Sequence, residues 1–374
     1  MKTKSYYLGL VLLGFLAWSC TNKDEMSLNS QGSLKASLNA NVQNLTTAMT
    51  VISSSPGYQV LAGSGPTSAP SLVKSTVSGL ESFVSAPLDT ISLSEIAGIY
   101  DYKASKYKKW HPELFNFFAK TGASSDFIVR LPESKVKNPM SLFHFMASDT
   151  TLVNNYVIDV SKYNYDFGRF LWDYTLASTI TIDNVAVGAL NVQSSKSRAN
   201  GYHFMSDFLF SNGYDAKVVY STGDTILSDY AITKGSTILF EEKFTAIKND
   251  TASRHREREY SLTVGNVTIV RVPTHGNNGL DSAKVYVGGV LQTKSKVEFI
   301  DITSKSDSTE FSIVGHNRDL KITFDDGTTS TVSQLLGSTI TGVRTLFTSL
   351  RQVYFATSIV DWVAWDIFRN RENM

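Results

Sequence analysis

The chain has 374 residues, and its 35 Lys and Arg residues are almost balanced by 34 Asp and Glu residues. Hydrophobic residues make up 42% of the chain, which is enough for a packed core and excludes global disorder. The balanced charge argues against a nucleic-acid partner, because nucleic-acid-binding proteins need a basic excess. The single cysteine excludes an internal disulfide framework and a cysteine-rich zinc site.

The first residues have the pattern of an export signal. Two lysines precede an apolar run at residues 6–18, which is shorter than the roughly 20 residues that a membrane-spanning helix needs. Cys20 follows this run and precedes a polar, acidic segment. We therefore predict that residues 1–19 are a signal peptide and that residues 20–33 are a short tether.

Cys20, with a small residue directly before it, resembles the lipobox of bacterial lipoproteins. Ala17 and Trp18 differ from that box, which favours Leu and a small residue at their positions. The polar residues after Cys20 resemble the surface-export signals of Bacteroidota lipoproteins. The resemblance implies acylation of Cys20, for instance by palmitate, and anchoring to the outer membrane on its periplasmic or exterior face. The alternative is a cleaved secretory signal with a chance cysteine.

Residues 34–122 are expected to form an N-terminal helical region. Apolar residues recur there at spacings of three and four, typical of one face of an amphipathic helix; they are Leu34, Leu38, Val42, Leu45, Met49 and Ile52. The segment Ser53 to Gly57 should end this helix. A shorter helix is expected over Pro112 to Lys120, with Pro in its first turn.

From residue 123 to residue 330 the pattern changes to period two, which is typical of strands. Short turns join the alternating runs, most clearly at Gly265-Asn266, Gly288-Gly289 and Asp325 to Gly327. We expect about ten to thirteen strands between residues 126 and 325. No helical pattern separates them, so the sheet should be mainly antiparallel.

Residues 331–374 are expected to form a long C-terminal helix that packs on the same domain. Its apolar residues follow helical spacing, whereas Arg351, Asp361 and Asp366 interrupt the apolar run and argue against a membrane span. The predicted fold class is α+β: a large, mainly antiparallel sheet flanked by N-terminal helices and a long C-terminal helix.

Catalytic signatures are absent from the sequence, which contains no Gly-x-Ser-x-Gly elbow, no His-Glu-x-x-His and no phosphate loop. His255, Glu257 and Glu259 would share one face of a strand about 6.6 Å apart, too far for one metal ion. We therefore predict no catalytic, cofactor-binding or metal-binding residue.

Two clusters are candidates for binding. Arg254, Arg256 and Arg258 would share the other face of that strand and could hold a carboxylate, sulfate or phosphate group. The alternative is a solvated edge strand that uses charge to prevent aggregation. Lys106, Lys108 and Trp110 form a basic, aromatic patch that could touch anionic lipid or an acidic glycan. Its alternative is a solvated helix face followed by a core Trp.

Aromatic residues are common in the predicted strands. They can stack on sugar rings when they lie on a sheet surface, or they can form core and cross-strand pairs. The residues in question are Tyr163, Tyr165, Trp172, Tyr174 and Tyr202.

Three functions remain open from the sequence. The favoured hypothesis is an exported, membrane-anchored lipoprotein that acts as a non-enzymatic binding or assembly module. The first alternative is a glycan-binding surface lipoprotein of a polysaccharide-uptake system. The second is a hydrolase whose site is assembled only in the tertiary fold, for example from two carboxylates.

Overall fold

A computed structural model describes most of the chain after residue 32. The described residues are 33–62, 90–103, 118–137, 151–168, 171–248, 256–272, 282–301, 318–352 and 354–371.

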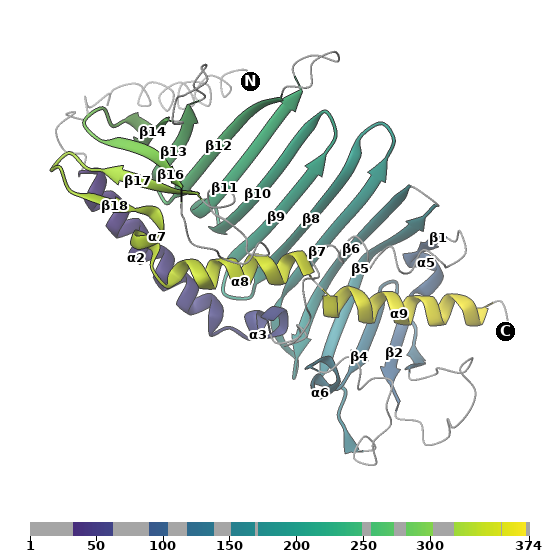
Figure 1. Cartoon of the computed structure of the whole chain (residues 1–374). Helices are drawn as coiled ribbons and strands as arrows, with labels where there is room; N and C mark the ends of the chain where they lie inside the picture. The colour runs from purple at the N-terminus through teal and green to yellow at the C-terminus, as the bar shows by residue number, and fades with distance from the viewer. Residues whose placement is uncertain are drawn as a thin grey trace, which may run out of the picture. The chain divides into compact units, whose positions relative to one another are not determined.

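The strands form one sheet in which almost every strand pairs with its neighbour in the sequence (Figure 1). All pairings are antiparallel except β2 with β4, and the order runs from β3 through β2 and β4 to β18. The strands are β1 Thr90–Ser92, β2 Gly98–Tyr102, β3 Phe118–Gly122, β4 Phe127–Leu131, β5 Tyr156–Phe167, β6 Trp172–Ile182, β7 Val185–Ser197, β8 Gly201–Phe210, β9 Tyr214–Thr222, β10 Thr225–Lys234, β11 Thr237–Lys248, β12 Arg256–Val264, β13 Val267–Val272, β14 Ser282–Val287, β15 Val290–Leu291, β16 Lys296–Asp301, β17 Arg318–Thr323 and β18 Thr329–Thr331. The large antiparallel sheet predicted from the alternation is confirmed.

The helices lie mainly before and after the sheet in the sequence. They are α2 Leu34–Ser53, α3 Pro56–Ala62, α5 Leu93–Ile96, α6 Glu133–Lys137, α7 Val332–Leu336, α8 Thr339–Gln352 and α9 Tyr354–Arg371. The apolar face predicted for α2 is buried from Leu34 to Ile52, except that Val42 is only partly buried. The α+β class, with helices at both ends of the chain, is therefore confirmed.

Two details differ from the sequence predictions. The sheet begins before residue 123, because β1, β2 and β3 lie within the region expected to be helical. The end of the helix expected up to Lys120 is strand instead: β3 pairs with β2, and the Phe118 ring contacts Tyr102 and Trp362. Tertiary pairing here overrides a local helical signal.

The C-terminal helix is divided into α7, α8 and α9. Gly337 ends α7 with a φ of 52°, a left-handed conformation that glycine adopts without strain. Between β4 and β17 the described residues contain fourteen strands, slightly more than expected. The three hairpins predicted from Gly265-Asn266, Gly288-Gly289 and Asp325 to Gly327 are all confirmed.

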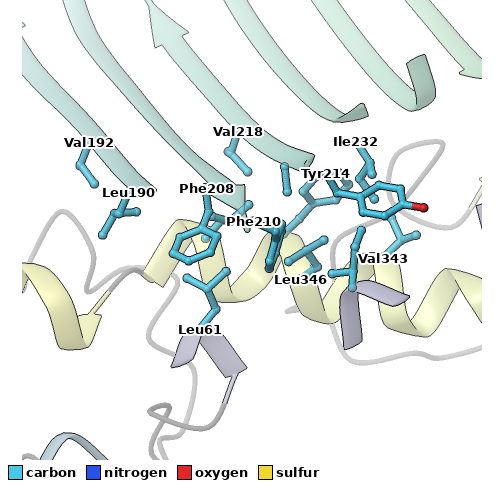
Figure 2. Close-up of a cluster of buried hydrophobic side chains, with 14 of the residues drawn as sticks. Leu61, Leu190, Val192, Phe208, Phe210, Tyr214, Val218, Ile232, Val343 and Leu346 are labelled. Atoms are coloured by element: carbon cyan, nitrogen blue, oxygen red, sulfur yellow. The ribbon is translucent and has the colours of Figure 1, made fainter. Parts of the chain in front are cut away.

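Helices α8 and α9 follow one another across one face of the sheet, which we call the helix face (Figure 1). Figure 2 shows side chains of β7 to β10 and of α3 packed against Val343 and Leu346 of α8. The α3 helix approaches closely because residue 57 is Gly. A Cβ there would lie 2.9 Å from the rings of both Phe208 and Phe210.

Burial on the helix face falls steeply along β9. In β9, Tyr214 is 7% exposed and Val218 is 1% exposed, whereas Tyr220 on the same face is 38% exposed. Helix α8 crosses β9 near Tyr214, where the strand begins, and does not cover the strand near Tyr220. We call the part of the helix face that lies under the helices the covered half, and the part toward Tyr220 the open half.

Candidate functional site

The open half carries a row of aromatic side chains across neighbouring strands. Phe167 of β5 lies opposite Trp172 of β6, Trp172 opposite Lys196 of β7, and Lys196 opposite Tyr202 of β8. Tyr220 of β9 follows on the same face. The ring centroids are 6.0 Å apart for Phe167 and Trp172, 5.9 Å for Trp172 and Tyr202, and 5.9 Å for Tyr202 and Tyr220. We call Phe167, Trp172, Tyr202 and Tyr220 the aromatic row.

The central ring of the row is held in a fixed orientation. Trp172 Nε1 donates a hydrogen bond of 3.1 Å to Ser194 Oγ, and Ser194 is only 1% exposed. The Lys196 Nζ atom lies 4.9 Å from the Trp172 ring centroid, a cation–π contact. The indole is thus restrained both toward the sheet and by its neighbour on β7.

One end of the row is continuous with the core. The Phe167 ring packs on Tyr165 at 4.3 Å, and the Tyr165 ring lies 5.3 Å from Trp365 of α9. From this buried end the row leads out to the exposed ring of Tyr220. Partly exposed aromatic faces offer flat apolar area, and the tyrosine hydroxyls add polar groups beside it.

An acidic side chain of α9, that of Asp361, faces the sheet next to the buried end of the row. The hydroxyls of Tyr163 and Tyr174 each donate a hydrogen bond of 3.0 Å to Asp361 Oδ1. Residue Asp361 as a whole is only partly buried, but its carboxyl group faces these two buried tyrosines. Burial raises the pKa of Asp361 from 3.8 to about 7, against the lowering effect of the two hydrogen bonds.

The same burial acts on the tyrosines around Asp361. Desolvation is the largest cause, and the nearby Asp361 carboxylate is the second. Together they raise the pKa of Tyr165 to about 12 and raise the pKa values of Tyr163 and Tyr174 well above the usual range of tyrosine. These phenols therefore remain hydrogen-bond donors at neutral pH. The arrangement fastens α9 to β5 and β6 rather than exposing a reactive group.

A second buried carboxyl lies under α8. Glu242 of β11 is 5% exposed and accepts a hydrogen bond of 3.0 Å from the Tyr260 hydroxyl. Burial raises the pKa of Glu242 well above its usual range, although Tyr260 and Arg344 act against this. Its neighbour Glu241 faces the other side of the sheet, as expected from the alternation. The two residues therefore cannot form the close carboxylate pair that glycoside hydrolysis needs.

On the central strands β8 to β11, the face of the sheet opposite the helices carries more acidic than basic side chains. Asp207, Asp215, Asp229 and Glu241 lie there, interleaved with two lysines on β9 and β11. Desolvation is the main cause that raises the pKa of Asp215, Asp229 and Glu241. Acidic side chains of the central strands are therefore concentrated on the face that lacks the aromatic row.

The described residues include only two of the predicted binding residues, Arg256 and Arg258. Lys106, Lys108, Trp110 and Arg254 lie outside them, as does Cys20. Arg256 is the first residue of β12.

Arg258 is exposed and lies on the helix face, because Tyr260 and Leu262 on the same side of β12 are buried. The fold thus brings Arg258 to the same face of the sheet as the aromatic row.

The aromatic residues singled out in the sequence divide into two groups. Tyr163, Tyr165 and Tyr174 are buried in the core, whereas Trp172 and Tyr202 belong to the aromatic row.

Sequence reasoning missed the other contributors to this surface. They are Phe167, Tyr220 and Lys196, with Ser194 beneath them. Phe167 and Trp172 flank the turn between β5 and β6, and Tyr202 follows the turn between β7 and β8. This position at strand ends was the one available signal.

No protein-family model, no curated protein and no solved structure matches this chain. Among the helices of the described residues, none combines the length and the apolar character needed to cross a membrane.

Proposed function

We propose that this protein is an exported, non-enzymatic lipoprotein that binds glycans through the aromatic row. The observation that carries the proposal is the run of four aromatic rings spaced about 6 Å apart over β5, β6, β8 and β9. Sugar rings have flat C–H faces edged with hydroxyls, and such faces stack on aromatic side chains. A row of rings offers successive stacking positions to a chain of sugars.

The order of the row supports this proposal. Trp172 is held by Ser194 and Lys196, so little side-chain freedom is lost when a ligand stacks on it. The hydroxyls of Tyr202 and Tyr220 can hydrogen-bond to sugar hydroxyls. A row of partly exposed large aromatic side chains is also unusual on a surface without a binding role.

The location completes the proposal. The lipobox-like Cys20 would attach the chain to the outer membrane, where a glycan-binding surface can meet extracellular or envelope polysaccharides. Labelling cells with a radioactive fatty acid tests the anchor. We expect incorporation into the wild-type protein and none into Cys20→Ala, and equal labelling of the two would contradict it.

A glycan array followed by calorimetry tests the binding function. We expect Trp172→Ala and Tyr202→Ala each to weaken binding about tenfold or more, because each removes a stacking position worth about 1.4 kcal/mol or more. Tyr286→Ala is the matched control, since Tyr286 is a half-buried tyrosine on the opposite face of β14. Binding that survives both row variants, or no binding to any glycan, would contradict the proposal.

A further inference from the structure

Lys196 lies in the middle of the aromatic row. The register places it directly between Trp172 and Tyr202, and its side chain is exposed. Its Nζ atom contacts the Trp172 ring at 4.9 Å. Within the described part of the chain, no carboxylate lies within ion-pairing distance of this ammonium group.

The acidic residues nearest to the row in sequence point away from it. Asp166 and Asp173 adjoin Phe167 and Trp172, but they lie on the opposite face. There, Thr90 Oγ1 donates to Asp166 Oδ1 at 3.3 Å, and Asn164 Nδ2 donates to Asp173 Oδ2 at 3.4 Å. Neither carboxylate is therefore available to the aromatic row.

The charged side chains near the row are mainly basic. Lys196 lies within the row, and the exposed Arg198 lies in the turn between β7 and β8. Arg258 lies on the same face of the sheet, but three strands beyond β9. Asp224, in the turn between β9 and β10, is an acidic residue at the same end of the sheet. The balance of the open half is thus opposite to that of the acidic face behind it.

Resting on the proposed function, we propose that the aromatic row selects polyanionic glycans, whose sugars carry carboxylate or sulfate groups. A sugar stacked across Trp172 and Tyr202 would cover the Lys196 ammonium and displace its water. Removing water from a cation is unfavourable unless an anion takes its place. A neutral glycan leaves that cost uncompensated, whereas an anionic substituent pairs with the charge.

Calorimetric titration with two matched pairs of polymers tests the proposal. Polygalacturonate and its methyl ester differ in the carboxylate, and dextran sulfate and dextran differ in the sulfate. We expect the charged member of at least one pair to bind at least tenfold more tightly than the neutral member. The pair that shows the preference identifies which anion is recognised.

The variants separate the role of Lys196 from general electrostatics. Lys196→Gln should weaken binding of the preferred polymer about tenfold and so remove most of the preference, because the bound sugar covers this ammonium group and excludes water from it. Lys162→Gln is the matched control, because Lys162 is an exposed lysine on the opposite face of β5, and it should leave the affinity unchanged. Trp172→Ala should weaken binding of both members of the pair.

The outcomes distinguish this inference from the function on which it rests. Trp172-dependent binding with equal affinity for charged and neutral members would overturn the anionic preference and leave glycan binding intact. Polyanion binding that responds equally to Lys162→Gln and Lys196→Gln would also overturn it. Failure to bind any glycan would overturn the proposed function and the inference together.

Discussion

The covered and open halves of the helix face are built from the same strands, yet they differ in what lies above them. In β8, Phe208 and Phe210 are buried beneath α3 and α8, while Tyr202, at the other end of the same face, is partly exposed. Both halves are rich in aromatic residues. The position of two helices across the strands therefore decides which rings form the core and which form a surface.

The largest expected effect lies in the covered half. Phe347 of α8 is fully buried, and its ring lies 5.4 Å from Tyr230 and 5.9 Å from Phe240. Phe347→Ala should lower the free energy of unfolding by about 3–5 kcal/mol, because it leaves a cavity between helix and sheet. Chemical denaturation measures this loss, and the folded fraction should still bind glycan.

Phe347→Leu removes less side-chain volume than Phe347→Ala, so it is the control and should lower the free energy of unfolding by less. If Phe347→Ala changed the free energy of glycan binding by more than it changed the free energy of unfolding, the separation between the two halves would be wrong.

At the boundary between the halves, Asp361 should make the stability of the folded protein depend on pH. Its pKa is raised to about 7 in the folded protein, so the folded state binds a proton more tightly than the unfolded chain. The resulting stability is fully present below about pH 4 and is lost as the pH rises toward about 7. The expected loss is on the order of 4 kcal/mol at most.

Glu242 acts in the same direction, so the comparison needs a variant that removes only one carboxyl. Asp361→Asn keeps a side-chain oxygen for the two tyrosines and does not titrate. Melting temperatures between pH 4 and pH 8 should decline less steeply for Asp361→Asn than for the wild type. Parallel curves would show that Asp361 does not titrate in this range.

The smallest effect on stability is expected in the open half. Tyr220 is 38% exposed, so Tyr220→Ala should change the free energy of unfolding by less than about 1 kcal/mol. The same variant should weaken glycan binding measurably. A large loss of stability without a change in affinity would assign Tyr220 to the core rather than to the binding surface.

The fold class could be predicted because alternation and turn residues are local signals. The run from Tyr260 to Val272 with its Gly265 turn predicted the hairpin of β12 and β13 correctly. The buried face of α2 followed from apolar spacing in the same way. The strands β1 to β3 were missed because their short segments gain stability mainly from pairing with distant strands.

The candidate site could be predicted only in part. Tyr174 and Trp172 lie two residues apart on one face of β6, so their sequence pattern is the same. Only the crossing point of α9 makes the first a core residue and the second a surface residue. The contact of Lys196 with Trp172 depends on the register between β6 and β7, which the sequence alone does not specify.

The order of elements along the chain has a consequence for biogenesis. The strands of the covered half end well before α8 and α9 begin at Thr339 and Tyr354. A growing chain therefore completes a broad apolar sheet surface before α8 and α9, which cover part of it, have been made. Such a surface promotes aggregation, so we expect the nascent chain to be a chaperone substrate until these two helices are made.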